Sequence, residues 1–173
     1  MEKMMKYPPL EIERKYLIVY PDEALLKAQP GCRVLEMEQI YLLAEKGVTA
    51  RVRRVLENGI ESFYHTEKVR RSALSSYETE REIDREAYRE LCKNADPGCC
   101  VIRKIRYKIP HGDLFAEIDV YPFWTRQAVL EIELPDENTV PDLPPYITVI
   151  RDVSGDKQYT NYSLAQKVPN QII

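Results

Sequence analysis

The feature that most constrains the fold of this chain is the alternation of side chains in residues 11–19, EIERKYLIV. Its β-branched and aromatic residues are typical of a β-strand, in which successive side chains point to opposite faces. Glu11, Glu13 and Lys15 are therefore predicted to share one face, while Ile12 and further apolar residues lie on the other. Two carboxylates at this spacing lie roughly 7 Å apart, close enough to hold one divalent cation between them. A solvated surface strand would show the same pattern, so this segment alone predicts no site.

Seven further segments repeat the alternation, and their charges form blocks of one sign. We predict strands over residues 34–43, 48–56, 60–69, 77–83, 99–109, 114–121 and 128–134. Short helices are predicted over residues 21–29 and 85–94. Asn58-Gly59 is a strong signal for a tight hairpin turn. Eight strands joined by short connections favour a closed antiparallel β-barrel over a sandwich, so we predict a mainly β fold with a few flanking helices.

The charged faces are predicted to line the inside of this barrel, because the apolar faces can be covered by the helices on the outside. The inward carboxylates would be Glu11, Glu13, Glu78, Glu80, Glu82, Glu117, Asp119, Glu131 and Glu133. The inward cations would be Lys15, Arg51, Arg53, Lys68, Lys104, Arg106 and Lys108. A domain is stable by only about 5–15 kcal/mol, which cannot offset the burial of so many charges without water or counterions. The interior is therefore predicted to be wet and to bind ions of both signs.

Length and charge limit the classes of protein that the chain can belong to. Its 173 residues suit a single domain over 1–173, and a net charge of -3 gives no general attraction to nucleic acid or an acidic membrane. Residues 1–6 lack the apolar core of a signal peptide, and no uncharged run approaches the ~20 residues of a membrane helix. The cysteines form no CxxC motif; they are Cys32, Cys92, Cys99 and Cys100. We therefore expect a soluble cytoplasmic protein, a monomer or homodimer, without a nucleic-acid or membrane partner.

The order of these motifs resembles the CYTH superfamily, also called triphosphate tunnel metalloenzymes, over about residues 10–165. The family's ExExK signature stands at Glu11–Lys15. Further family elements are Gln39 with Tyr41-Leu42, Arg51-x-Arg53, Thr66-x-Lys68, Glu78-x-Glu80-x-Glu82, Lys104-x-Arg106-Tyr107, Glu117-x-Asp119-Val120 and Glu131-x-Glu133-Leu134. Residues 152–161 are similar to the family's EVTxD and YxN ending, but Asp152 replaces the glutamate there.

The resemblance implies a barrel that binds a triphosphate with basic side chains and activates it with Mg²⁺ or Mn²⁺ on carboxylates. The implied phosphate-binding residues are Lys15, Arg51, Arg53, Lys68, Lys104 and Arg106. The implied metal ligands are Glu11, Glu13, Glu131, Glu133, Asp119 and Glu78. The implied catalytic residues are Glu11, Glu13, Lys15, Glu80 and Glu82.

Three functions compete at this point. The first is hydrolysis of inorganic triphosphate or a related triphosphate, in which metal-activated water attacks a terminal phosphorus. It is favoured because no aromatic clamp for a base is evident: the only tryptophan, Trp124, is predicted to lie in a turn. The second is a class IV-type adenylate cyclase that converts ATP to cyclic AMP and pyrophosphate. The third is a non-enzymatic polyphosphate-binding module, which would have little use for the inward carboxylates.

Overall fold

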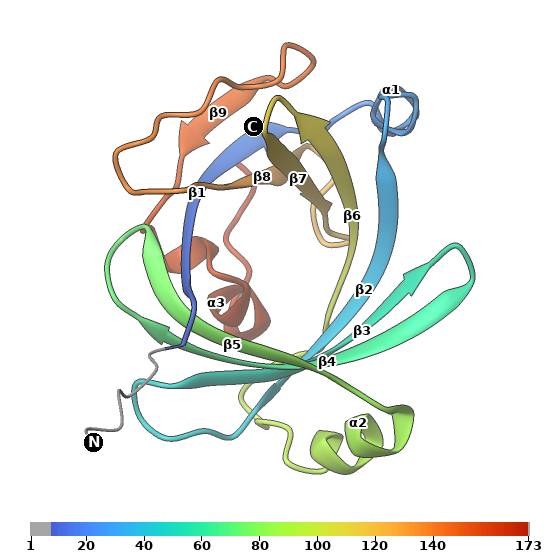
Figure 1. Cartoon of the computed structure of the whole chain (residues 1–173), viewed down its shortest axis with the longest axis vertical. Helices are drawn as coiled ribbons and strands as arrows, with labels where there is room; N and C mark the ends of the chain where they lie inside the picture. Colours follow the sequence, from blue (N-terminus) through green and yellow to red (C-terminus); the bar gives the residue numbers. More distant parts are fainter. Residues whose placement is uncertain (1–7, 173) are drawn as a thin grey trace, which may run out of the picture.

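Eight antiparallel strands close into a barrel, and a ninth short strand extends one of its seams (Figure 1). The structure is a computed structural model that describes residues 8–172, so the prediction about residues 1–6 lies outside the described residues. Around the barrel the strands follow the order β1-β5-β4-β3-β2-β6-β7-β8, and β8 pairs with β1. The strands are β1 (Leu10–Val19), β2 (Arg33–Leu42), β3 (Thr49–Glu57), β4 (Ile60–Arg70), β5 (Ser75–Ile83), β6 (Ile102–His111), β7 (Leu114–Val120), β8 (Gln127–Glu133) and β9 (Val149–Asp152). The closed eight-stranded barrel predicted from the alternation is confirmed.

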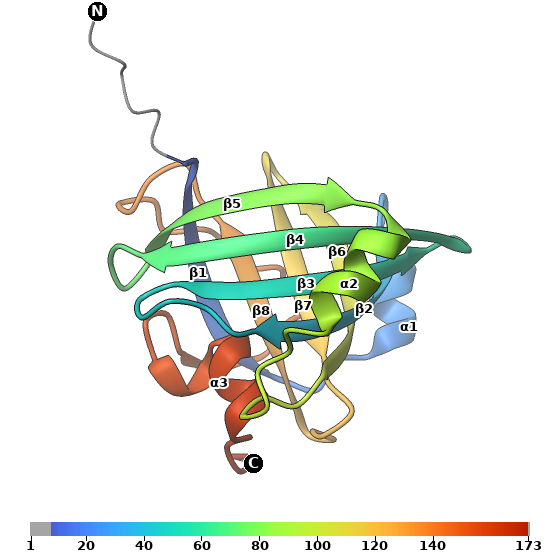
Figure 2. The same ribbon diagram turned by 90° about the horizontal axis from the view of Figure 1, so that it is seen from below.

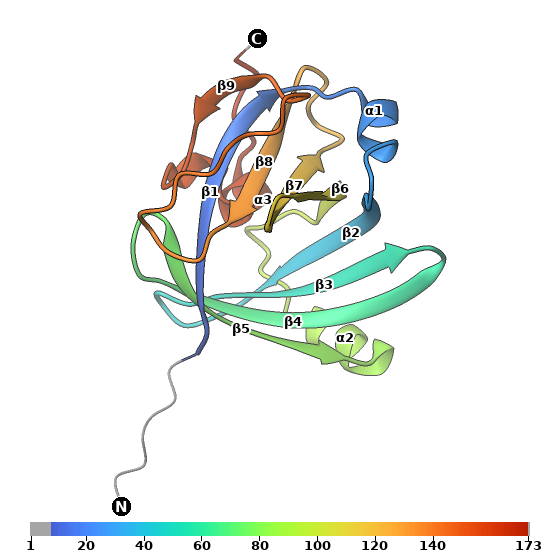
Figure 3. The same ribbon diagram turned by 45° about the horizontal axis from the view of Figure 1, so that its top comes forward.

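The β1 strand is shared between two neighbours on one of its sides. Its first residues, 10–12, pair with residues 75–77 of β5, whereas residues 16–18 pair with the unpredicted strand β9 (Figure 3). Its other side pairs with β8 over residues 13–19. The strand β9 has only four residues, which is too short for an alternating pattern to reveal it. Strand β9 thus pairs with the part of β1 that β5 does not reach.

Turns and caps set the limits of the elements. Asn58 and Gly59 both have positive φ, of 51° and 78°, as the tight hairpin between β3 and β4 requires. The helices α1 (Glu23–Lys27) and α2 (Arg85–Cys92) are capped by Asp22 and Asp84 and are shorter than predicted. The β6 strand begins three residues later than predicted, because the backbone N–H groups of residues 99 and 100 bond outside the sheet, to Asp96 and Ala165.

The outward apolar faces are covered by helices, as expected, and also by an irregular segment. Leu26 of α1 packs on the β1, β6, β7 and β8 side, together with residues 143–147 from the connection that follows β8. On the opposite side, Tyr88 of α2 packs against Phe63 of β4, with ring centroids 4.9 Å apart (Figure 2). The barrel therefore carries these two hydrophobic cores outside the strands, which leaves much of the inside available for charges.

One end of the barrel is filled by a separate apolar cluster. Leu17, Tyr41 and Tyr121 point inward there and meet Leu164 of the short helix α3 (Asn161–Gln166). The 3-10 helix η1 (Lys157–Tyr159) precedes α3 and contributes Tyr159 to the same cluster. No helix in residues 8–172 is both long enough and apolar enough to cross a membrane.

Candidate active site

The charged inner faces surround a cavity of about 810 Å³ inside the barrel. The residues predicted as a site from the sequence that line this cavity are Glu11, Glu13, Lys15, Arg51, Arg53, Lys68, Glu78, Glu80, Arg106, Glu131 and Glu133. The period of two within each strand places them on the same inner surface. A cavity of this size, open to solvent and lined by both signs of charge, suits a small polyanion together with cations.

Three of the predicted site residues do not line this cavity. Lys104 and Asp119 are fully buried and form an ion pair of 2.6 Å, Nζ to Oδ2, and neither residue lines the cavity. Glu82 lies near the exposed end of β5, opposite Tyr64 of β4. Its side chain is on the same face of β5 as Glu78 and Glu80, but this end of the strand extends beyond the enclosed part of the barrel.

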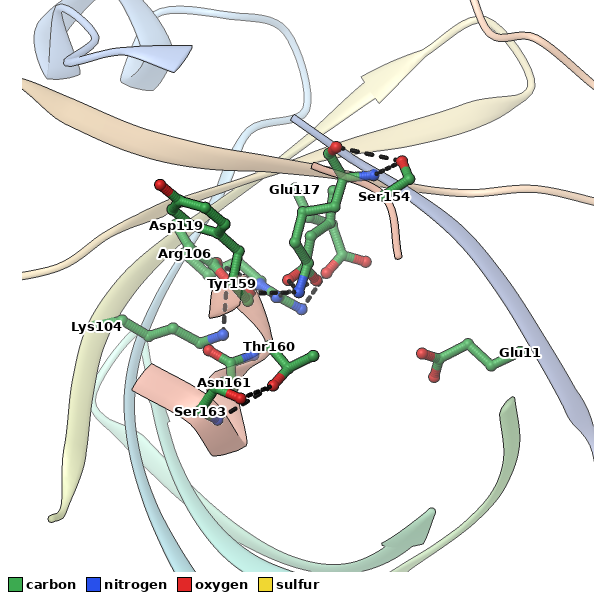
Figure 4. Close-up of polar contacts among 12 residues, drawn as sticks. Glu11, Lys104, Arg106, Glu117, Asp119, Ser154, Tyr159, Thr160, Asn161 and Ser163 are labelled. Carbon is green, nitrogen blue, oxygen red and sulfur yellow. Dashed lines mark hydrogen bonds and ion pairs between the residues drawn. The ribbon is translucent and has the colours of Figure 1, made fainter. Parts of the chain in front are cut away.

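Arg106 is surrounded by carboxylates from two neighbouring strands (Figure 4). Its Nε and Nη2 donate to the two oxygens of Asp119 at 2.7 and 2.8 Å, and Nη2 also donates to Glu131 at 3.0 Å. Its Nη1 donates to Glu117. Although burial opposes the shift, Asp119 and Glu117 hold the pKa of Arg106 well above its usual value. The charge of Arg106 is therefore already balanced within the protein.

The lysines of the cavity are also paired. Lys15 lies 3.2 Å from Glu131, Nζ to Oε1, and donates to the backbone oxygen of Tyr159 at 3.3 Å. Lys68 lies between two carboxylates, 2.6 Å from Glu11 and 2.9 Å from Glu78. A ligand that binds these lysines would have to share them with the carboxylates.

Arg51 and Arg53 of β3 differ from Lys15, Lys68 and Arg106, because neither forms an ion pair in residues 8–172. Both are at most 9% exposed. Arg53 donates through Nε and Nη2 to Oε1 of Gln39, at 2.8 and 2.5 Å. Although burial opposes the shift, the pKa of Arg51 is raised by Tyr41 and then by Glu78. These two guanidinium groups present unbalanced positive charge to the cavity.

Two carboxylates at the β1–β8 seam have no cationic partner. Glu13 lies opposite Glu133 in the strand register, and neither side chain has a hydrogen bond or ion pair within the described part of the chain. Burial, followed by the nearby Glu117, raises the pKa of Glu133 to about 7. Burial and a hydrogen bond with Glu78 raise the pKa of Glu11 to about 7, and burial with Glu131 raises that of Glu13. Each carboxylate would be stabilised in its ionised form by a cation.

The donor chemistry of this seam fits a hard divalent cation, which takes carboxylate oxygens as ligands. The side chains do not, however, form a closed set: nowhere in residues 8–172 are three or more His, Cys, Asp or Glu residues grouped as a metal centre. Binding of a metal would therefore draw carboxylates together that repel one another in the free protein.

Other polar residues lie apart from the cavity or gain a role only from the structure. His65, His111 and Asp152 are not among the residues that line it. Glu117 and Gln39 were not predicted as site residues, although Glu117 shares the inward parity of Asp119. Gln39 is fully buried and contacts Arg53, a role that only the register of β2 against β3 reveals.

Comparisons with known proteins agree with this fold. No family model matches the chain. An inorganic triphosphatase of Acetivibrio thermocellus is 32% identical over 161 residues, which cover 90% of this chain and 93% of that protein. The crystal structure of another inorganic triphosphatase is similar with a TM-score of 0.55 and 25% identity, covering 92% and 97% of the two chains. A protein of Pyrococcus horikoshii OT3 shares the fold, with a TM-score of 0.57, 21% identity and coverage of 74% and 80%.

Proposed function

This chain belongs to the CYTH superfamily of triphosphate tunnel metalloenzymes, and we propose that it hydrolyses inorganic triphosphate to pyrophosphate and phosphate. The resemblance found in the sequence is thus confirmed. The observation that carries the proposed substrate is the cavity itself. It combines two arginines that form no ion pair, Arg51 and Arg53, with two carboxylates, Glu13 and Glu133, that form none within the described part of the chain.

Binding of the phosphate chain is assigned first to Arg51 and Arg53. A triphosphate carries about four negative charges and needs several donors to balance them. Planar guanidinium groups present forked N–H donors that match phosphate oxygens, and these two are not shared with a carboxylate. Lys15 and Lys68 line the same cavity and can add donors if they exchange part of their ion pairs for phosphate contacts.

The implied metal site is assigned to carboxylates of β1 and its two neighbours, β8 and β5. Glu11, Glu13 and Glu133 would hold Mg²⁺ or Mn²⁺, with Glu131 and Glu78 at the edges of the group. When bound, such a cation neutralises phosphate charge and activates a water for in-line attack on a terminal phosphorus. The chain's own contribution is to keep these carboxylates close together and partly desolvated, so that their ionised forms favour a cation.

Two predicted site residues are buried and do not line the cavity, so we assign them supporting roles. Lys104 and Asp119 were expected to bind phosphate and metal, but both are fully buried: Lys104 pairs with Asp119, and Asp119 also accepts from Arg106. We assign to both the positioning of Arg106. Glu80, which accepts a hydrogen bond of 2.8 Å from Thr66, remains a candidate to orient water at the open side of the cavity, with Glu82 beyond it.

Phosphorus NMR of the products tests this function. The protein is incubated with inorganic triphosphate or with ATP, each with Mg²⁺, with Mn²⁺ or with EDTA. We expect pyrophosphate and phosphate from inorganic triphosphate, more efficient turnover of triphosphate than of ATP, and no turnover in EDTA. Cyclic AMP and pyrophosphate from ATP, with negligible cleavage of triphosphate, would assign a cyclase instead. Tight binding without any product would assign a polyphosphate-binding module.

A further inference from the structure

The side chain that holds Arg53 in the cavity is a neutral amide. Gln39 lies directly opposite Arg53 in the register of β2 and β3, and it is fully buried. Its Oε1 accepts from both Nε and Nη2 of Arg53, at 2.8 and 2.5 Å. Two donors on one acceptor fix the plane of the guanidinium group. The Nη1 donors of Arg53 are not used by Gln39 and remain for a ligand.

Other basic side chains of the barrel are held by carboxylates instead. Arg106 is bound by Asp119, Glu117 and Glu131, and Lys104 is bound by Asp119. In each case the partner that positions the cation also cancels its charge. Gln39 positions Arg53 to a comparable extent but adds no charge, so the positive charge of Arg53 stays available in a nearly closed environment.

The buried amide of Gln39 lowers the stability of the folded state. Nε2 of Gln39 is buried and has no hydrogen-bond partner within the described part of the chain. A buried donor without a partner destabilises the folded state, and a carboxylate at this position would both avoid that cost and pair with Arg53. An amide is the less stable choice for holding an arginine, which indicates a role other than stability.

From these contacts we propose that Gln39 is a positioning residue that orients Arg53 toward the phosphate chain without neutralising it. This rests on the proposed function, and it adds a specificity element: a neutral partner on β2 keeps the β3 side of the cavity cationic. The same logic extends to Tyr41, which lies opposite Arg51 in the register and, like Gln39, carries no carboxylate.

The test compares Gln39→Glu, Gln39→Met and Arg53→Ala in affinity for inorganic triphosphate, measured by calorimetric titration of EDTA-treated protein, in which turnover is stopped. Gln39→Glu places a carboxylate beside Arg53, so affinity should fall roughly tenfold to a hundredfold, the scale of one lost charge-assisted interaction. The melting temperature of the same variant without ligand should stay equal or rise. Loss of binding together with retained or raised stability is a signature that a merely structural role would not produce.

The other variants complete the test. Gln39→Met keeps the charge of Arg53 but not its orientation, so it should bind triphosphate several-fold more weakly than wild type and more tightly than Gln39→Glu. The double variant Gln39→Met/Arg53→Ala should bind no worse than Arg53→Ala, because Gln39 acts only through Arg53. Arg14→Ala, on the outside of β1, is the matched control and should bind as wild type.

The outcomes separate this inference from the function on which it rests. Wild-type affinity in Gln39→Glu, or in Gln39→Met where Gln39→Glu does not fold, would overturn the inference while hydrolysis by wild type stands. Losses that simply add in the double variant would also overturn it, because Gln39 would then act independently of Arg53. Failure of the wild-type protein to bind inorganic triphosphate would overturn the proposed function and this inference with it.

Discussion

Two basic rows of the barrel, Arg51-x-Arg53 on β3 and Lys104-x-Arg106 on β6, have the same spacing but opposite surroundings. The β6 row faces β7, where Arg106 lies opposite Asp119, and its charges are balanced by buried carboxylates. The β3 row faces Tyr41 and Gln39 of β2, and neither of its arginines forms an ion pair in residues 8–172. We therefore propose that the same residue types stabilise the fold on one wall and bind a ligand on the other.

The largest effect is expected from removing Arg106, which tests whether the β6 row stabilises the fold. Arg106→Ala would leave Glu117, Asp119 and Glu131 buried without their common partner, and the loss of one member of a buried ion pair costs about 3–5 kcal/mol. We expect that loss in the free energy of unfolding by urea at pH 7. A variant as stable as wild type would show that the β6 row is not a structural element.

Removing either arginine of the β3 row tests whether this row binds the phosphate chain. Arg51→Ala and Arg53→Ala should each weaken triphosphate binding by about 1.5–3 kcal/mol, because each loses a charge-assisted interaction inside the site. Their stability should fall less than that of Arg106→Ala, since no carboxylate is left unpaired and Arg53→Ala leaves only the neutral Oε1 of Gln39 without its donor. Titration of each variant with triphosphate measures the first effect and urea unfolding the second. Unchanged affinity with a large loss of stability would reverse the assignment of the two walls.

The sequence could predict only the part of this difference that depends on the pattern of residues within one strand. The inward parity of Arg51, Arg53 and Arg106 follows from the period of two within one strand, and the barrel follows from its repetition. The partner opposite each arginine depends on the register between strands, which the pattern of a single strand does not contain. The sequence therefore predicted equal phosphate-binding roles for both rows.

Non-local contacts also explain the elements that the sequence analysis missed. The segment 149–166 has no clear periodicity, yet Val153, Tyr159 and Leu164 are buried at the end of the barrel. Ser154 is placed by β1, since its Oγ accepts from the backbone N–H of Lys15 at 2.9 Å. Only the family's closing motif indicated that this segment belongs to the site region.

A third prediction concerns the pH dependence of the acidic seam. Glu11 has a pKa of about 7 in the fold, raised by burial from 4.5, and Glu133 behaves in the same way. Between these pH values the folded state binds protons that the unfolded state has released, so stability falls as the pH rises from about 5 to about 8. We expect the melting temperature in EDTA to drop over this range, on the order of a few °C.

The control for this effect is Glu11→Gln, which removes one of the titrating carboxylates and should flatten the curve. Added Mg²⁺ or Mn²⁺ should restore the melting temperature at pH 8 more than at pH 5, because the ionised carboxylates bind the cation. A melting temperature that rises from pH 5 to pH 8 in EDTA would contradict the raised pKa of Glu11 and Glu133.

The smallest effect is expected outside the barrel. Arg14 points away from the cavity and lies 3.6 Å from Asp152, a partly exposed pair of the kind that contributes about 0–1 kcal/mol. Arg14→Ala should therefore leave triphosphate turnover unchanged, whereas Lys15→Ala, one residue along β1, should reduce it. Equal losses of kcat/KM in the two variants would show that the inward and outward assignments of β1 are incorrect.

The most direct test of the difference between the two walls is the NMR signal of the arginine side chains during titration with inorganic triphosphate in EDTA. Each Nε–H group reports on its own surroundings, and arginine-to-lysine variants assign the signals. The Nε signals of Arg51 and Arg53 should shift as triphosphate binds, while that of Arg106 should stay unchanged within its carboxylates. A shift of Arg106 with unchanged signals from Arg51 and Arg53 would contradict the central claim that the phosphate chain binds to the β3 wall.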